Sequence, residues 1–120
     1  MAKSSEIIIR VNLNEENVPE SIEWKASDHP DAKEFQTAKG MLISFFDQET
    51  KDTLKIDLWT EKMQVMEMDR FIFQTLKGLT NTYVRATNNH KLGSAMKQLT
   101  EYFGEETEIL KKDPNKSDGE

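Results

Sequence analysis

Hydrophobic and polar positions alternate in three stretches of this chain, the pattern of strands that bury one face. These stretches are residues 5–13, residues 22–26 and residues 53–60. A fourth stretch, residues 41–46, is apolar except for Ser44, as in a strand covered on both faces. Turn-forming residues lie between neighbouring stretches, so consecutive strands are expected to pair as antiparallel hairpins.

A short helix is expected over residues 30–39, between the second and third strands. Ser27-Asp28-His29-Pro30 has the composition of a helix start, and Gly40 is suited to end a helix. In this interpretation Ala32 and Phe35 cover one face of the sheet. The alternative is that this face stays open as a contact surface.

Beyond residue 62 the hydrophobic spacing becomes that of a long helix that begins within residues 62–66. A broad apolar stripe follows one side of it, and a narrower apolar line runs beside the stripe through Met66, Phe73 and Val84. Gly78 in mid-helix costs about 1 kcal/mol relative to Ala unless a neighbour packs closely there. A second helix is predicted after Asn88-Asn89-His90, with Gly104 as a weak point. Its apolar stripe consists of Leu92, Ala95, Met96, Leu99, Phe103 and Leu110.

Together these elements predict an α+β fold with an antiparallel four-stranded sheet. The expected order is strand, strand, short helix, strand, strand, and two C-terminal helices cover the sheet. Residues 1–112 form a single domain in this interpretation, and the polar residues 113–120 form a disordered tail.

Composition narrows the possible functions. The chain is 36 % hydrophobic and 32 % charged, and its net charge of −6 disfavours nucleic acid as a partner. It contains no cysteine, which excludes disulfides, thiolate catalysis and cysteine-based zinc sites. No apolar run is long enough for a signal peptide or a membrane span, so a cytoplasmic location is expected.

No residue pattern indicates catalysis or cofactor binding. His29 and His90 sit in turn-like surroundings without metal-ligand spacing. The loop of residues 47–52 only faintly resembles a calcium site, because the glycine and the distal glutamate of that motif are missing. Asp57 is interpreted as a strand residue on the solvent face. No catalytic, cofactor or metal residue is therefore assigned, and the protein is expected not to be an enzyme.

Exposed apolar side chains are the remaining candidates for function. If Met41, Ile43 and Phe45 face the helices, then other apolar residues must lie on the opposite side of the sheet. Such a surface implies a partner protein or a homodimer, with Trp59 as the anchor, because buried aromatic side chains dominate interface energetics. The proposed interaction surface consists of Ile8, Leu42, Phe46, Trp59, Met66, Phe73 and Val84.

Four collinear segments carry a resemblance to a known family. They are VPESIEWKASD (Val18–Asp28), GMLISFFD (Gly40–Asp47), TLKIDLWTEKM (Thr53–Met63) and FIFQTLKGLTNTYVRATNN (Phe71–Asn89). This set resembles GldC, the gliding motility-associated protein C of Bacteroidetes. In that family the long helix is expected to begin with polar residues, whereas Met66 is apolar here.

The resemblance implies a soluble cytoplasmic accessory of the gliding machinery, an apparatus linked to protein secretion, and transfers no catalytic residue. The first hypothesis is therefore a non-enzymatic interaction protein that binds a component of the gliding or secretion apparatus. The alternative is an acidic, dimeric, secretion-chaperone-like module that binds an exported protein. The third is a small-ligand binder or an enzyme whose site the sequence does not reveal.

Overall fold

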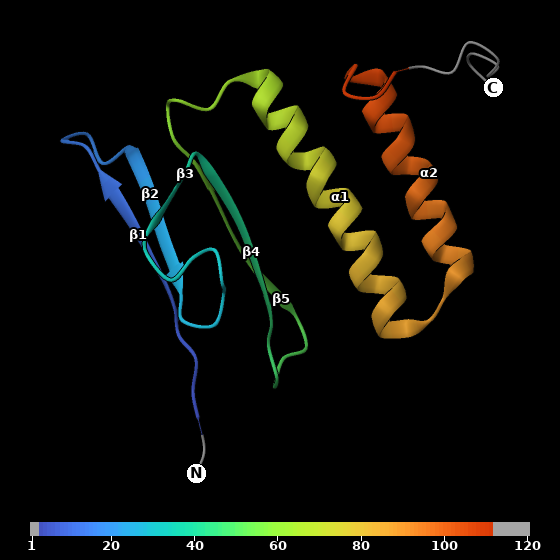
Figure 1. The fold of residues 1–120 in the computed structure, drawn as a ribbon, viewed down its shortest axis with the longest axis horizontal. Helices are drawn as coiled ribbons and strands as arrows, with labels where there is room; N and C mark the ends of the chain where they lie inside the picture. The colour runs from blue at the N-terminus through green and yellow to red at the C-terminus, as the bar shows by residue number, and fades with distance from the viewer. Residues whose placement is uncertain (1–2, 112–120) are drawn as a thin grey trace. The chain divides into compact units, whose positions relative to one another are not determined.

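The computed structural model describes residues 3–111, and the chain divides into two compact units, residues 1–63 and residues 64–120. The first unit contains five strands and the second contains two helices (Figure 1). This arrangement confirms the predicted α+β class. The predicted disordered tail, residues 113–120, lies outside the described residues.

Three strands form the first sheet: β1 (Ile7–Leu13), β2 (Pro19–Ala26) and β3 (Gln36–Ala38), antiparallel and in that order. A register shift between Asn12 and Leu13 places Leu13 opposite Pro19. A bulge suits this position because proline has no N–H to donate to the ladder.

The two faces of the first sheet differ in polarity, as the alternation predicts. Pairing of Ile9 with Trp24 and of Val11 with Ile22 puts these side chains on one face. Ile22 is 1 % exposed and forms the centre of the small core of this unit. Arg10, Asn12, Ser21 and Glu23 share the opposite face.

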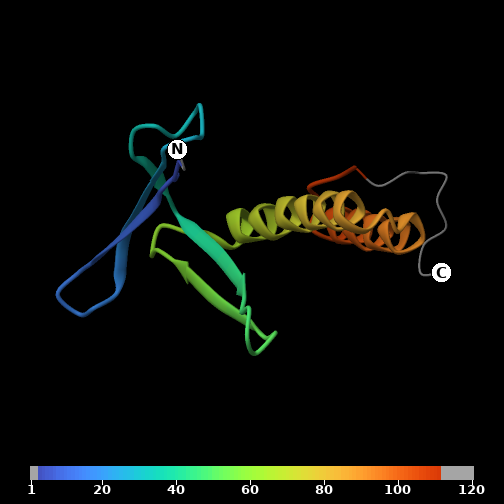
Figure 2. The same ribbon diagram turned by 90° about the horizontal axis from the view of Figure 1, so that it is seen from below.

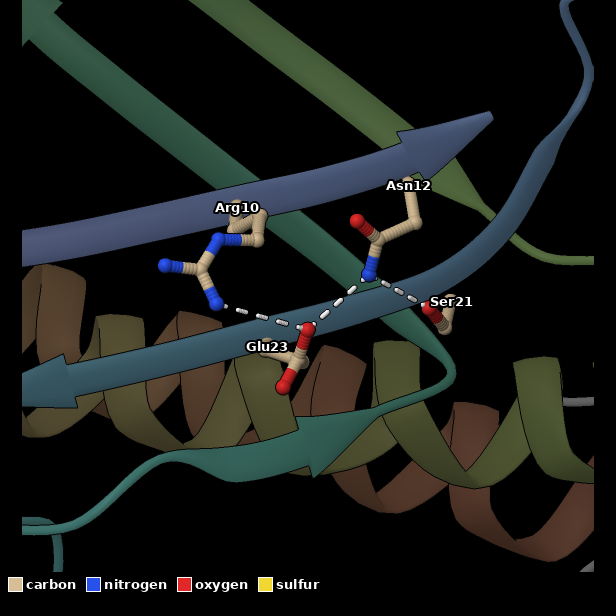
Figure 3. Close-up of polar contacts among 4 residues, drawn as sticks. All are labelled: Arg10, Asn12, Ser21 and Glu23. Atoms are coloured by element: carbon tan, nitrogen blue, oxygen red, sulfur yellow. Dashed lines mark hydrogen bonds and ion pairs between the residues drawn. The ribbon is translucent and has the colours of Figure 1, made fainter. Parts of the chain in front are cut away.

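Figure 3 shows a polar network on that opposite face. The Asn12 side-chain amide donates to the Ser21 hydroxyl at 2.8 Å and to the Glu23 carboxylate at 2.9 Å. Arg10 lies 3.8 Å from the same carboxylate. Arg10 also lies over the Phe35 ring, 4.5 Å from its centre, and Lys25 is 4.7 Å from the same centre. These contacts connect β1, β2 and the segment before β3.

Two strands form the second sheet: β4 (Gly40–Phe46) and β5 (Thr53–Trp59), joined by a tight turn. Their register puts six apolar side chains on one side, which we call the Ile56 face. It consists of Met41, Ile43, Phe45, Leu54, Ile56 and Leu58. The other side, which we call the Trp59 face, consists of Leu42, Ser44, Phe46, Thr53, Lys55, Asp57 and Trp59.

Two predictions about this unit are wrong. The predicted four-stranded sheet is divided into sheets of three and two strands. An additional short strand, β3, pairs with β2, whereas the predicted strand of residues 41–46 corresponds to β4 and pairs with β5. The chain passes from one sheet to the other at Lys39, between β3 and β4 (Figure 2).

The short helix predicted over residues 30–39 does not form. Residues 27–35 make turns instead, and Gln36–Ala38 is strand β3. The Ala32 backbone carbonyl accepts from the Ala26 N–H at 2.8 Å, and the Ala32 side chain is 1 % exposed. Backbone pairing with β2 thus replaces the hydrogen bonds that a helix would have made.

The second unit is an antiparallel pair of helices, α1 (Val65–Thr87) and α2 (His90–Glu106) (Figure 1). The start of α1 lies where the sequence predicts it, and the Gln64 N–H donates to the Glu67 carboxylate at 3.0 Å. Asn88 ends α1 in the left-handed conformation, with φ of 58°. The Asn89 side chain then caps α2 by accepting from the Leu92 N–H at 3.1 Å.

Glycines allow the two helices to approach closely. A Cβ atom at Gly104 would lie 2.6 Å from the Phe73 ring, and one at Gly93 would overlap the Val84 side chain. Phe73 is 6 % exposed, so it is the principal buried side chain of this unit. Leu110, predicted to extend the α2 stripe, instead follows the helix and packs over Gly104, where its N–H donates to the Gly104 carbonyl.

The broad apolar stripe of α1 does not point at α2. At about 100° per residue, Leu79 lies about 120° around α1 from Phe73, and Leu99 lies about 140° around α2 from Gly104 in the same rotational sense. Because the helices are antiparallel, these similar offsets put both stripes on one side of the hairpin. Leu79 is 53 % exposed and Leu99 is 56 % exposed. The helical hairpin therefore has one apolar side.

Candidate functional site

The two histidines have local structural contacts. The His29 ring accepts at Nδ1 from the Asp31 N–H at 3.1 Å and packs edge-on against Trp24, with ring centres 5.9 Å apart. The His90 ring lies 2.9 Å from the Asn88 side-chain oxygen, next to the α2 cap. These contacts support the loop and the helix cap in which the histidines lie.

The carboxylate of Asp47 belongs to the β4–β5 turn. It accepts from the Thr50 N–H at 2.8 Å and from the Glu49 N–H at 3.0 Å. The backbone and side-chain hydrogen bonds from Thr50, followed by the Glu49 N–H, hold the pKa of Asp47 below its ordinary value of 3.8. This carboxylate therefore closes the turn in its ionised form.

Residues 3–111 contain no group of three or more histidines and carboxylates placed to hold a metal ion. Within the same residues, neither helix is long and apolar enough to cross a membrane. A groove of about 370 Å³ lies between α1 and α2. Its lining is Phe73, Lys77, Thr80, Asn81, Lys97, Thr100, Glu101 and Leu110.

The Trp59 face brings together three residues of the interaction surface predicted from sequence. Phe46 is 70 % exposed, Trp59 is 55 % exposed and Leu42 is 37 % exposed. Between them on β5, Lys55 and Asp57 form an ion pair of 3.4 Å. The face thus combines two exposed aromatic rings with a pair of opposite charges.

The Ile56 face of the β4–β5 sheet also carries side chains with large exposed fractions. Phe45, Leu54 and Ile56 are 60 %, 63 % and 48 % exposed. The alternation along β4 and β5 correctly grouped these side chains on one face.

The other predicted surface residues belong to other strands and helices. Ile8 belongs to the first sheet, on the same face as Arg10 and Asn12. Met66 is 79 % exposed at the start of α1. Phe73 and Val84 lie along the line where α1 meets α2, against Gly104 and Gly93. The structure thus groups Leu42, Phe46 and Trp59 on one face of the β4–β5 sheet. Ile8 belongs to the first sheet, and Met66, Phe73 and Val84 belong to the helical unit.

The chain matches a known protein family. The family model described as "GldC-like: Gliding motility-associated protein GldC-like" matches residues 19–109. This range covers most of the described chain, from β2 to the end of α2. The chain belongs to the GldC-like family.

Membership confirms the resemblance seen in the sequence and connects the chain to gliding motility. The match includes β2, β3, the β4–β5 sheet and the helical hairpin, so the Trp59 face and the Ile56 face are parts of the GldC-like region. No curated protein and no solved structure matches the chain. The family therefore indicates the process, gliding motility, and does not specify the molecular role.

Proposed function

We propose that this GldC-like protein is a non-enzymatic, cytoplasmic accessory that binds a protein component of the gliding or secretion apparatus. The binding surface is the Trp59 face of β4 and β5. The observation that carries this proposal is the exposure of Phe46 and Trp59, 70 % and 55 %, on adjacent strands of one small sheet.

Phe46 and Trp59 are suited to anchor a partner because they are large and exposed. Large aromatic side chains contribute most of the binding energy in protein interfaces when a partner desolvates them. A two-stranded sheet is at best marginally stable by itself in water. A partner that covers the Trp59 face would bury both rings and would stabilise the β4–β5 hairpin as well.

The local roles of the ionisable groups favour a binding protein over an enzyme. His29 and His90 contact neighbouring residues of their own loop and cap. The Asp47 carboxylate is held by the turn, and Asp57 pairs with Lys55 on an exposed strand. None of these groups is combined with a second acid or base in a cleft, as general acid–base catalysis requires.

The test compares Trp59→Ala and Phe46→Asp with Tyr102→Ala. Tyr102 is an aromatic residue of α2 with 63 % exposure, so its removal is a matched control for the loss of an exposed ring. We expect roughly a 10-fold or greater loss of partner binding for the two sheet variants and unchanged binding for the control. Binding is measured by quantitative co-purification of tagged protein from a gliding bacterium that lacks its own copy.

Stability measurements separate binding from folding. The three variants should unfold at denaturant concentrations close to that of the unchanged protein. If Trp59→Ala or Phe46→Asp abolishes folding, these side chains are core and the proposed surface is wrong. Recovery of exported proteins instead of apparatus components would favour the secretion-chaperone alternative.

A further inference from the structure

The outer edge of β5 has no neighbour in the described part of the chain, where β4 is the strand that pairs with β5. Two hydrogen bonds define the phase of the β4–β5 ladder. The Asp47 N–H donates to the Asp52 carbonyl at 2.9 Å, and the Thr60 N–H donates to the Lys39 carbonyl at 2.8 Å. Both belong to the same alternating set of hydrogen-bonded pairs.

This phase determines which backbone groups of β5 point outward. Every second residue bonds to β4, starting from Asp52, so Leu54, Ile56 and Leu58 direct their N–H and C=O groups inward. The residues between them direct the same groups to the outer edge. These residues are Thr53, Lys55, Asp57 and Trp59.

An edge of this kind is a template for another strand. Proteins usually block such edges with proline, a bulge or charges that repel a second copy. β5 contains no proline, and its register with β4 has no shift. Its charges, one lysine and one aspartate, flank Ile56 symmetrically.

The sequence of β5 is complementary to itself when two copies run antiparallel. In Leu54-Lys55-Ile56-Asp57-Leu58, residues at equal distances from Ile56 are either both leucine or opposite in charge. A two-fold axis through Ile56 therefore puts Lys55 directly opposite Asp57 of the second copy, and Asp57 opposite Lys55 of the second copy. Opposite charges in such cross-strand positions are stabilising, and like charges are destabilising.

The backbone selects the same register. Outward-pointing residues must pair with outward-pointing residues, and the axis through Ile56 pairs Lys55 with Asp57 as required. Two neighbouring symmetric registers also pair outward-pointing residues with each other. An axis through Lys55 puts the two lysines directly opposite each other, and an axis through Asp57 does the same with the two aspartates.

We propose that this protein forms a two-fold symmetric dimer by antiparallel pairing of β5 with β5 of a second copy. The product is a four-stranded sheet in the order β4, β5, β5, β4. The two Ile56 faces then become one continuous apolar surface, with Ile43 and Ile56 of each copy in its central row. This dimer does not depend on which protein binds the Trp59 face.

The outer edge of β1 offers no comparable match. Its charged residue is Arg10, which already contacts Glu23 and the Phe35 ring. Antiparallel copies of β1 centred on Arg10 would put two arginines opposite each other. Charge complementarity thus favours β5 as the edge that meets a second copy.

The charge test uses Lys55→Glu and Asp57→Lys. Each variant alone would create two like-charge pairs across the interface, so we expect its dimer dissociation constant to rise roughly 10-fold or more. An equimolar mixture of the two variants restores opposite charges at both pairs. We therefore expect the mixture to form heterodimers, measured by sedimentation velocity across a concentration series.

The control variants make the same type of charge reversal at exposed positions outside β5. They are Lys91→Glu on α2 and Asp28→Lys in the loop after β2. Both control variants should dimerise like the unchanged protein. A monomeric unchanged protein would overturn the proposal. A dimer insensitive to both β5 variants, such as one formed through the apolar side of the helical hairpin, would also overturn it.

A cysteine test reports the register directly, because the natural chain contains no cysteine. At the axis, Ile56 and its counterpart form a non-hydrogen-bonded pair with Cα atoms about 4.5 Å apart, within the range of a disulfide. We expect Ile56→Cys to give a disulfide-linked dimer on mild oxidation. Leu54→Cys should cross-link with Leu58→Cys in a mixture but not with itself, and any other pattern would exclude this register.

Discussion

At the residue scale, three glycines of the helical hairpin have different roles. Gly93 and Gly104 lie where α1 and α2 touch, and a Cβ atom at either position would overlap Val84 or Phe73. Gly78 has no atom within 4 Å of the position its Cβ would take. Close approach explains the first two glycines, and only Gly78 carries the full penalty of glycine in a helix interior.

This difference predicts opposite effects of alanine. Gly78→Ala should raise the free energy of unfolding by about 0.5–1 kcal/mol, because alanine has a lower conformational entropy in the unfolded chain. Gly104→Ala should lower it by about 1–3 kcal/mol through overpacking against Phe73 and Leu110. Urea denaturation of both variants checks the signs. Equal effects would mean that Gly104 is not a contact point.

Asp47 gives a prediction about pH. Its folded-state pKa is lowered, chiefly by the hydrogen bonds from Thr50, so ionisation stabilises the folded turn. This contribution is complete above the ordinary value of 3.8 and is lost as the pH falls through the lowered folded-state pKa. Asp47→Asn removes the titration and keeps an acceptor. The stability difference between the unchanged protein and this variant should therefore shrink on acidification, as measured by denaturation at several pH values.

At the element scale, the sequence predicted the strands and helices whose patterns are long and regular. Strand β1, strand β5 and the start of α1 agree with the alternation and with the change of period near residue 62. The helix predicted over residues 30–39 is wrong because its local helix signals compete with backbone pairing to β2. This pairing depends on residues 22–24, which lie outside the segment. The break at Lys39 has no signal in hydrophobicity, so the division into two sheets could not be foreseen.

Phe35 illustrates what replaced the predicted helix. The charged groups of Arg10 of β1 and Lys25 of β2 lie 4.5 Å and 4.7 Å from the centre of its ring. Phe35→Leu keeps an apolar side chain and removes the ring, so it isolates the two cation–π contacts. We expect a loss of about 1–2 kcal/mol in the free energy of unfolding, from about 0.5–1 kcal/mol per contact. A loss as small as that of Gln36→Leu, an exposed neighbour, would show that the contacts contribute nothing.

At the scale of the whole molecule, the candidate surface was partly predictable. Alternation along β4 and β5 correctly grouped Leu42, Phe46 and Trp59, because strand register follows from a period of two. It gave no indication that Phe73 and Val84 face α2, because α2 contacts α1 at these two side chains through Gly93 and Gly104 and not at the broad apolar stripe of α1. Which side of an amphipathic helix meets its neighbour depends on close approach, and here glycines on α2 decide it.

The proposed dimer makes stability depend on concentration, which gives a last prediction. A species that forms only from two folded copies shifts the folding equilibrium by mass action. The thermal midpoint of the unchanged protein should therefore rise by about 2–4 °C for each tenfold increase in concentration. The Lys55→Glu variant should show a much weaker dependence, and its equimolar mixture with Asp57→Lys should recover the full dependence. A midpoint that is constant for all three samples would mean that β5 pairing contributes nothing to the stability of the folded chain.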